Sequence, residues 1–169
     1  MRSVFRLPED LDQLSRLVVY PGMIADESRP LRAFLTTYYR DFDEVRFNVR
    51  VGPGEAAPAD ADDSLRRAIE QGTRMRMDAV AFKQPNVATL IEAKKDAGND
   101  AVWQLLAYRD HYVAEHPDHV IRLVIVAESM TLSARTIARS RGITLALFTF
   151  ADSPSIDAPP LTTERTDGV

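Results

Sequence analysis

The chain has 169 residues, of which 45% are hydrophobic and 27% charged, a composition typical of one globular domain with a full hydrophobic core. It contains no cysteine, which excludes disulfides, thiolate metal ligands and a thiol nucleophile. The sequence has neither a run of about 18 apolar residues nor a signal-peptide pattern, so we expect no membrane partner and a cytoplasmic location.

The net charge of −4 and the isoelectric point near 5.4 argue against a protein that binds nucleic acid over its whole surface. The charges are unevenly distributed along the chain, however. Acidic residues gather in 55–63 and in the C-terminal tail. Six arginines lie close in sequence to the central strands that we predict below: Arg46, Arg50, Arg66, Arg67, Arg74 and Arg76. A local basic surface is therefore compatible with the acidic total.

The first part of the chain is expected to be an N-terminal extension, residues 1–27, that contains a short helix after Pro8. A helix capped by Ser28 should follow, because apolar residues recur at helical spacing. These residues are Leu31, Phe34, Leu35, Tyr38 and Tyr39. Residues 44–51 alternate between apolar and polar side chains, which predicts a half-buried antiparallel strand. Its apolar face is expected to carry Val45, Phe47, Val49 and Val51.

A segment rich in Gly, Pro, Ala and Asp interrupts the apolar pattern after this strand. We predict that residues 52–73 form a mobile insertion, with a loop at 52–63 and a short helix at 64–71. The insertion ends where the next apolar run begins, so it is expected to connect two strands.

Residues 74–82 and 87–93 are short runs rich in aliphatic side chains, and the turn-forming sequence between them predicts a hairpin. Strand alternation places Glu92 and Lys94 on one face of the second strand. A turn of odd length, or one bulge, would place Asp78 directly opposite Glu92. Two carboxylates facing each other across a ladder repel, and a divalent cation between them would turn that repulsion into a binding site.

The second half of the chain alternates between helical and buried-strand patterns. A helix is predicted at 99–114, and nearly continuous apolar runs at 120–127 and 143–150 predict parallel strands covered on both faces. A helix capped by Thr131 and ending at Gly142 would connect them. These elements predict an α/β fold with a mixed sheet flanked by helices. The composition of residues 151–169 predicts a flexible tail.

The residue types in the hairpin and the following helix predict a magnesium-dependent phosphodiesterase. Asp78, Glu92 and the backbone carbonyl of Ala93 supply the hard oxygen ligands that Mg²⁺ prefers. Lys94 would position a water molecule or stabilise developing negative charge. Gln104 lies early in the predicted helix, where its side chain should lean toward these strand ends and support the site.

The same residues, Asp78, Glu92-Ala93-Lys94 and the Gln104 to Tyr108 helix segment, resemble the motifs of the PD-(D/E)XK nuclease superfamily. The resemblance covers about residues 28–149, and its strand-helix-strand end is similar to that of branched-DNA and mismatch endonucleases. Met77 stands where the family's name has proline. An acidic-x-Lys triplet alone is a weak signal, so the resemblance depends on the surrounding strands and helix.

The resemblance implies a restriction-endonuclease-like domain over residues 28–150 and a DNA endonuclease that uses Mg²⁺, with Mn²⁺ as a substitute. It also implies an additional acid on the first helix, for which Glu27 is the candidate, although a charge in the first turn of a helix is the more common role for such a residue. Cleavage of both strands of a duplex would require two sites, as in a homodimer, whereas an enzyme that cuts a flap or a single strand could act as a monomer.

Several alternatives stay open at this point. Glu92 and Lys94 could form a solvated strand end, or the fold could serve a non-catalytic nucleic-acid binder or a protein-interaction module, which the acidic isoelectric point favours. Trp103 and Tyr108 are expected to be packing residues rather than stacking platforms. Three histidines, His111, His116 and His119, have a spacing that matches no helical pair of zinc ligands.

Overall fold

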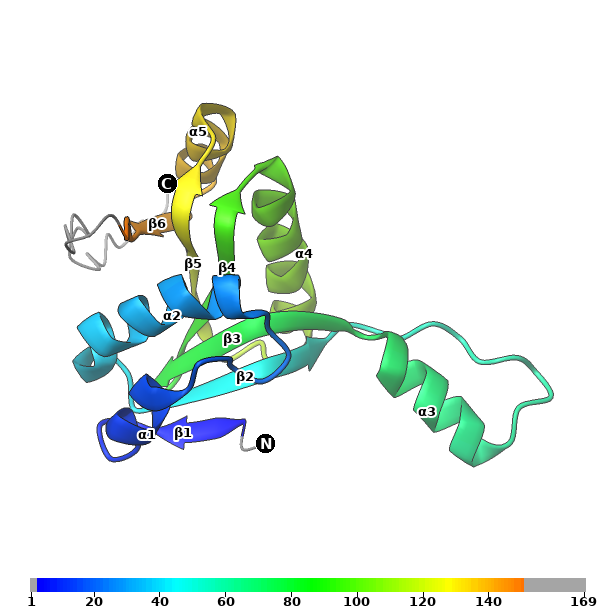
Figure 1. The fold of residues 1–169 in the computed structure, drawn as a ribbon. Coiled ribbons are helices and arrows are strands. Elements are labelled where there is room, and N and C mark those ends of the chain that lie inside the picture. The colour runs from blue at the N-terminus through cyan, green and yellow to red at the C-terminus, as the bar shows by residue number, and fades with distance from the viewer. Residues whose placement is uncertain (1–2, 151–169) are drawn as a thin grey trace.

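The computed structural model describes residues 3–150 and contains one six-stranded sheet with the strands in chain order (Figure 1). The strands are β1 (Val4–Arg6), β2 (Glu44–Val51), β3 (Met75–Lys83), β4 (Val87–Ala97), β5 (Val120–Met130) and β6 (Thr144–Leu147). The pairs β1–β2, β2–β3 and β3–β4 are antiparallel, whereas the pairs β4–β5 and β5–β6 are parallel. The predicted α/β fold with a mixed sheet is confirmed.

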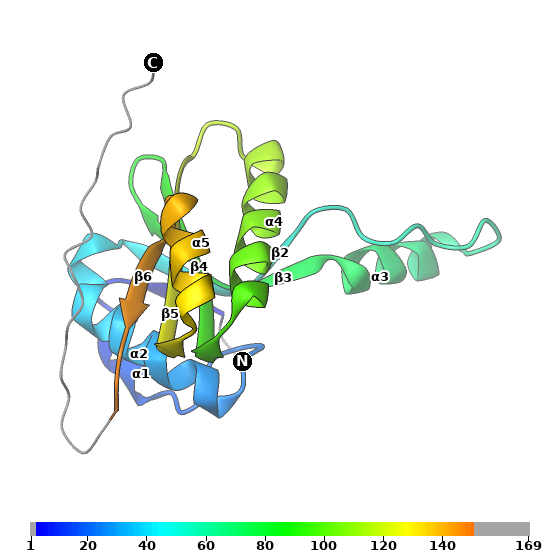
Figure 2. The same cartoon turned by 90° about the horizontal axis from the view of Figure 1, so that it is seen from above.

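Helices cover both faces of the sheet. They are α1 (Leu11–Arg16), α2 (Ala25–Tyr38), α4 (Asn99–Glu115) and α5 (Leu132–Ser140). A short 3₁₀ turn, η1 (Tyr39–Asp41), follows α2, and a further helix, α3 (Asp63–Thr73), lies away from the sheet (Figure 1). α1 and α2 pack over one face, where Phe34 and Ile91 belong to the same core. α4 and α5 lie side by side over the other face, where Leu105 and Ile125 are fully buried (Figure 2).

The parallel strands take the positions that their apolar sequences predict. α4 connects β4 to β5 and α5 connects β5 to β6, which supplies the crossover that parallel neighbours require. The side chain of Thr131 accepts a hydrogen bond from the Ala134 amide at 3.3 Å and caps α5 as predicted. Gly142, at φ +67°, makes the turn after that helix.

The N-terminal segment is part of the sheet and of the first core. β1 pairs with β2, and Phe5, Leu14 and Tyr20 are buried among the α2-side residues. α2 begins at Ala25, so the boundary expected at residue 27 falls inside this helix. Ser28 is not the helix cap that we predicted. Its hydroxyl is buried and instead binds the Tyr20 amide at 3.0 Å and the Ile24 carbonyl at 2.8 Å.

β2 does not keep one apolar face along its length, contrary to the prediction. Val45 and Phe47 belong to the core under α2, whereas Val51 belongs to the core under α4. Asn48 lies between them with φ +56°, a left-handed backbone conformation that asparagine tolerates better than most residues. The alternation therefore changes face at Asn48, and β2 contributes to both cores.

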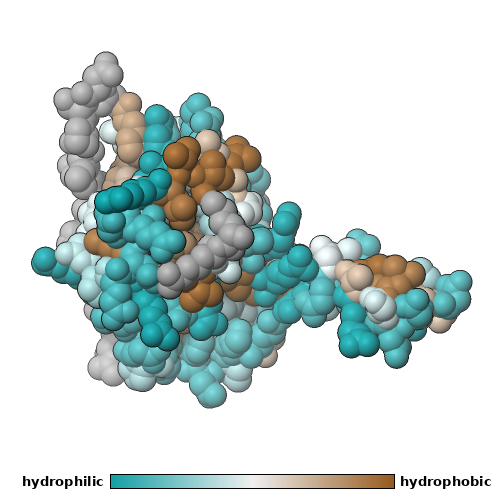
Figure 3. Space-filling model, turned by 60° about the horizontal axis from the view of Figure 1, so that its bottom comes forward, coloured by the Kyte–Doolittle hydropathy of each residue, from teal (hydrophilic) through white to brown (hydrophobic). Residues whose placement is uncertain are grey.

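The insertion between β2 and β3 projects from the body of the protein (Figures 1 and 2). Asp62 caps α3 by accepting the Leu65 amide at 2.7 Å, so the helix starts slightly before the predicted residue 64. No residue of α3 is buried, and an apolar patch lies on the projecting helix (Figure 3), where Leu65 is half exposed. The mobility expected for residues 52–73 stays a prediction, and the tail at 151–169 lies outside the described residues.

No helix within the described part of the chain combines the length and the apolar character needed to cross a membrane.

Candidate active site

The site lies where the sheet divides. β3 and β4 pair from Lys83 and Val87, beside their three-residue turn, to Ala79 and Ile91. Beyond that point β3 continues beside β2, and β4 continues beside β5. Figure 1 shows these two pairs of strands diverging. We call the place where they separate the fork.

The register of the hairpin brings the two predicted acids to the base of the fork. Asp78 and Glu92 are the next residues after the last ladder pair, Ala79 and Ile91, so they face each other across the opening. The turn has the odd length that this arrangement requires. Glu92 and Lys94 share one side of β4, as alternation predicted, and the Lys94 ammonium lies 3.0 Å from Glu92 Oε1.

The Asp78 side chain takes the place of the backbone hydrogen-bond acceptor that β3 no longer supplies to β4. Its Oδ2 accepts a hydrogen bond from the Ala93 amide at 2.9 Å, at a position where β3 has already turned away from β4. Burial raises the pKa of Asp78 to about 6, against the opposing effects of the Ala93 hydrogen bond and the Lys94 charge. One side chain thus ties the two branches of the fork together and still carries a carboxylate at the site.

Glu92 is the most unusual group in the site, because its carboxylate is buried with little compensation. Its side chain is 1% exposed, and neither oxygen has a hydrogen-bond donor among the described residues. The Lys94 ammonium forms an ion pair with Oε1 at 3.0 Å, which is the compensation that this buried charge receives. Burial, followed by repulsion from Asp78, raises the pKa of Glu92 to about 8. Such a group costs stability unless something else binds it.

Lys94 forms ion pairs with two carboxylates, Glu92 and Glu27. Besides Glu92, its ammonium contacts Glu27 Oε1 at 3.1 Å, and Glu27 comes from the first turn of α2. Burial lowers the pKa of Lys94, but Glu92, Asp78 and Glu27 together raise it by more, so that its pKa lies above the ordinary value. Lys94 is therefore a fixed positive charge, and Glu27 lies at the site itself.

Gln104 contacts a neighbour of the acids, Tyr108. Its Nε2 donates to the hydroxyl of Tyr108, one turn later on α4, and that hydroxyl donates to the Arg76 carbonyl at 2.6 Å. Burial and the nearby Glu92 charge raise the pKa of Tyr108 to about 12. Gln104 thus reaches the site through Tyr108. Tyr108 is buried, as expected of a packing residue, whereas Trp103, for which we made the same prediction, is half exposed.

A further set of polar contacts surrounds the fork. Lys95 Nζ lies 3.4 Å from Asp26 Oδ2, and Ser129 donates to Asp96 at 2.5 Å. No signal in the sequence identifies these partners, because they depend on how α2 lies against β4 and on the register of β4 with β5.

The described residues contain no group of three or more histidine and acidic side chains arranged to hold a metal ion. What the fork offers a cation is two facing carboxylates, Asp78 and Glu92, of which Glu92 has both oxygens without a hydrogen-bond donor. The N–H and C=O of a strand residue point toward the same neighbour, so the amide of Ala93, bound to Asp78, indicates that its carbonyl also faces the fork. These oxygens fit a hard divalent cation that keeps several waters.

Comparison with known proteins found no matching family model and no matching curated protein. Two solved structures are similar. The crystal structure of a repair endonuclease from Pyrococcus abyssi is 18% identical, covers 60% of this chain and 39% of its own, and gives a TM-score of 0.37. The structure of EndoMS in apo form is 18% identical, covers 74% of this chain and 47% of its own, and gives a TM-score of 0.42. This chain thus spans less than half of either protein, and at these TM-scores neither likeness contributes to the functional assignment.

Proposed function

We propose that this protein is a divalent-metal-dependent nuclease that hydrolyses phosphodiester bonds of DNA at the fork. The observation that carries the proposal is the buried Glu92 carboxylate, which faces Asp78, lies beside the Lys94 ammonium and has no hydrogen-bond donor of its own within the described residues. A protein that used this position only for structure would gain stability from an apolar residue there.

Asp78, Glu92 and the carbonyl of Ala93 are the groups that would hold the cation, Mg²⁺ or Mn²⁺. When bound, such an ion supplies positive charge that favours ionisation of water and stabilises the phosphoryl transition state. Its binding would also offset the burial that raises the pKa values of both acids and, at Glu92, the repulsion from Asp78.

Lys94 acts as a hydrogen-bond donor in this proposal and not as a base. Its pKa lies above the ordinary value, so it keeps its protons through the neutral range. A charged ammonium can orient the attacking water or contact a phosphoryl oxygen. Glu27, 3.1 Å away, would hold the ammonium in place and serve as the additional acid.

A polyanionic substrate also fits the β2–β3 branch of the fork. Arg50 and Arg76 lie directly opposite each other in that ladder, and both are exposed. Like charges at such a pair destabilise a sheet, and a bound phosphate backbone would relieve the repulsion. We therefore infer that the DNA approaches along this branch.

Cleavage assays test the proposal. Labelled duplex, single-stranded, flap and mismatched DNA, with RNA for comparison, would be incubated in Mg²⁺, Mn²⁺ or EDTA. We expect cutting that requires the metal and falls by at least about 100-fold in Lys94→Ala and in Asp78→Asn. Lys95→Ala is the matched control, because this neighbouring lysine points to Asp26 and not to the acids of the fork.

A supercoiled plasmid would report the assembly in the same assay. Linear product without accumulation of nicked circles indicates a homodimer that cuts both strands, whereas nicked circles alone indicate one active site per substrate. Absence of cutting by the folded wild-type protein in either metal, or equal cutting by Lys94→Ala, would overturn the proposal and favour a non-catalytic binding protein.

A further inference from the structure

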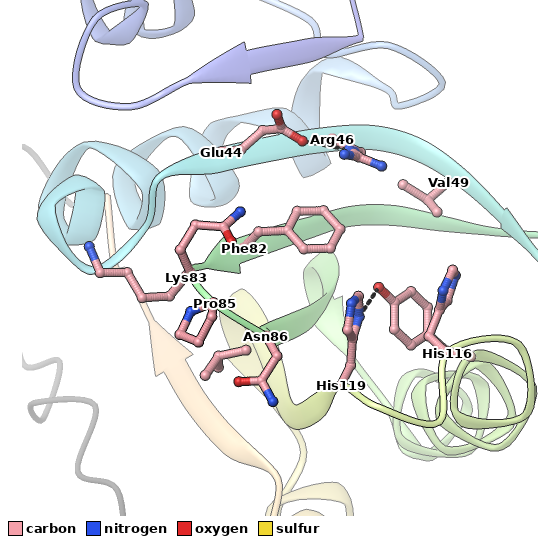
Figure 4. A pocket seen from close by; sticks show the side chains of 12 residues that line it. Glu44, Arg46, Val49, Phe82, Lys83, Pro85, Asn86, His116 and His119 are labelled. Atoms are coloured by element: carbon pink, nitrogen blue, oxygen red, sulfur yellow. Dashed lines mark hydrogen bonds and ion pairs between the residues drawn. The ribbon is translucent and has the colours of Figure 1, made fainter.

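A second feature lies at the other end of β3 and β4, beside their turn. A cavity of about 340 Å³ opens there between the sheet and the end of α4 (Figure 4). Val87, on its wall, precedes Glu92 by five residues, which corresponds to about 17 Å along a strand. We call this cavity the ring-lined pocket, after four side chains on its wall: Phe82, Tyr112, His116 and His119.

These four rings form one connected group, in which Tyr112, His116 and His119 contact one another and Phe82 contacts His119. Phe82 and His119 have centroids 6.1 Å apart, and Tyr112 lies 5.8 Å from His119 and 4.4 Å from His116. The two imidazoles are nearly parallel, at 12° and 5.3 Å. His116 is exposed and His119 and Phe82 are partly exposed, so these three rings can meet a ligand, whereas Tyr112 belongs to the core.

A hydrogen bond to Tyr112 fixes the orientation of the His119 ring. The Tyr112 hydroxyl and His119 Nδ1 are 3.0 Å apart, and Tyr112 itself is buried. The hydroxyl of Tyr112 is thus engaged with His119, which leaves Nε2 as the ring nitrogen of His119 that can meet a ligand. An imidazole held in one orientation is a better stacking surface than a free one, because less entropy is lost on binding.

A cation lies directly against these rings, over Phe82. Arg46, on β2, places its guanidinium 4.7 Å from the centroid of Phe82, and about half of its side chain is exposed. Glu44 pairs with it at 2.6 Å on one side. A guanidinium has five donors, so this contact leaves others for an anion.

The pocket therefore joins flat ring surfaces to a positive group. A simple anion would use Arg46 but not the rings, and an apolar ligand would use the rings but not Arg46. A nucleotide uses both, since its base stacks on aromatic side chains and its phosphate binds arginine. The volume suits one small ligand and not a double helix.

We propose that the ring-lined pocket binds one unstacked nucleotide of a single-stranded DNA segment whose chain continues to the fork. The ligand class rests on the proposed nuclease function. The pocket and the fork belong to the same two strands, so a strand running between them would be held at two points, with the phosphate to be cut at the fork. Substrates with an unpaired segment would then be bound more tightly than fully paired duplex.

Binding can be measured without cleavage. DNA oligonucleotides that carry the fluorescent base 2-aminopurine in an unpaired segment, at varied distances from the duplex junction, would be titrated with protein in EDTA. We expect quenching at one distance, which marks stacking, and at least about 5-fold weaker binding by His119→Ala and by Phe82→Ala. His111→Ala is the matched control, because this histidine lies on α4, outside the pocket, and packs near Gly52. Melting curves would confirm that each variant is folded.

Equal quenching in a fully paired duplex, unchanged binding by both pocket variants, or equal competition by inorganic phosphate and a nucleoside monophosphate would overturn this inference. The outcome is separable from that of the nuclease proposal. Quenching by a protein that never cuts would support the pocket and contradict the nuclease, whereas metal-dependent cutting without quenching would support the nuclease and contradict the pocket.

Discussion

The fork and the ring-lined pocket lie at opposite ends of the ladder between β3 and β4, and their charged groups differ in burial. At the fork, Glu92 is 1% exposed, and both of its oxygens are without a hydrogen-bond donor in the described part of the chain. At the pocket, Arg46 is about half exposed and paired with Glu44 at 2.6 Å. Desolvation of Glu92 lowers the stability of the folded protein, whereas the exposed Arg46–Glu44 pair has little effect on it because water screens the two charges.

This difference separates two ways of building a site. The buried acids of the fork destabilise the folded protein, so a ligand that binds them should increase the stability of the whole protein. The pocket holds groups that the surface tolerates without a ligand, so its loss should change affinity and little else. The predictions below test that contrast.

The largest expected effect is a dependence of stability on pH that originates at Glu92. Its pKa is raised from 4.5 to about 8 in the folded protein, so folding is favoured by the bound proton below pH 4.5 and this contribution is lost as the pH rises toward 8. The slope should approach about 1.4 kcal/mol per pH unit in metal-free buffer. The pKa of Asp78, raised from 3.8 to about 6, adds a similar loss of stability in the lower part of this pH range. Urea unfolding in EDTA between pH 4 and 9 measures it.

Glu92→Gln is the control for this prediction, because it keeps the shape of the side chain and removes its titration. The slope should flatten in the variant, and Mg²⁺ should raise the stability of the wild type at pH 8 by about 2.7 kcal/mol at 100 times its dissociation constant, with no such gain in Glu92→Gln. A steep slope that persists in the variant, or stabilisation of both proteins by Mg²⁺, would show that Glu92 is not the group responsible.

The local parts of the fork are predictable from sequence because they depend on neighbours in the chain. Strand alternation places Glu92 beside Lys94, and the odd turn places Asp78 across from Glu92. The cap at Thr131 and the parallel strands that flank α5 follow from equally local rules. Each of these features is set by a few consecutive residues.

Other features of the fork arise only when distant elements pack together. Glu27 meets Lys94 across 67 positions of the chain, and Arg29 binds Glu128 in a bidentate pair, at 2.7 and 2.5 Å, across 99 positions. Both contacts depend on the angle at which α2 crosses the sheet, which no local pattern specifies. The helix-dipole role suggested for Glu27 rests on its place in the first turn alone, and the sequence could not show that this turn lies against β4.

The ring-lined pocket could not be predicted from the sequence for a related reason. His116 and His119 follow the end of α4, where helical spacing no longer applies, and Phe82 comes from a strand of the hairpin. The ring from β3 and the rings from the end of α4 come together only when α4 packs on the sheet. The change of face at Asn48 is similar, because a positive φ at one position of β2 redirects the alternation that follows it.

A moderate effect is expected from Glu27→Gln. Glutamine can still accept a hydrogen bond from Lys94, so the ammonium should stay near its place, but one of its three neighbouring charges is lost. We expect the cleavage rate to fall by about 10-fold, less than in Asp78→Asn, with DNA binding at the pocket unchanged. Cleavage kinetics in Mg²⁺ measure the effect. Asp26→Asn, next to it and paired with Lys95, is the control, and an equal loss in both variants would reduce Glu27 to a general surface charge.

The smallest effects should come from two hydroxyls on α4 that lie one helical turn apart. Tyr108 donates to the Arg76 carbonyl at 2.6 Å, near the fork, whereas Tyr112 meets His119 Nδ1 at 3.0 Å, in the pocket. Both rings are buried, so Tyr108→Phe and Tyr112→Phe each remove one hydrogen bond worth about 1 kcal/mol and leave the packing in place.

The two variants should nevertheless differ in what they impair. Tyr108→Phe should slow cleavage by a few-fold, because Gln104 and the β3 backbone lose a shared contact beside Glu92, and it should leave quenching of 2-aminopurine intact. Tyr112→Phe should leave the cleavage of short oligonucleotides intact and reduce the quenching, because His119 is no longer held in one orientation. Identical changes in both assays would mean that the helix couples the two ends of β3 and β4, so that the fork and the pocket act as one site. Opposite changes would show that one helix serves two sites, each through a single hydroxyl.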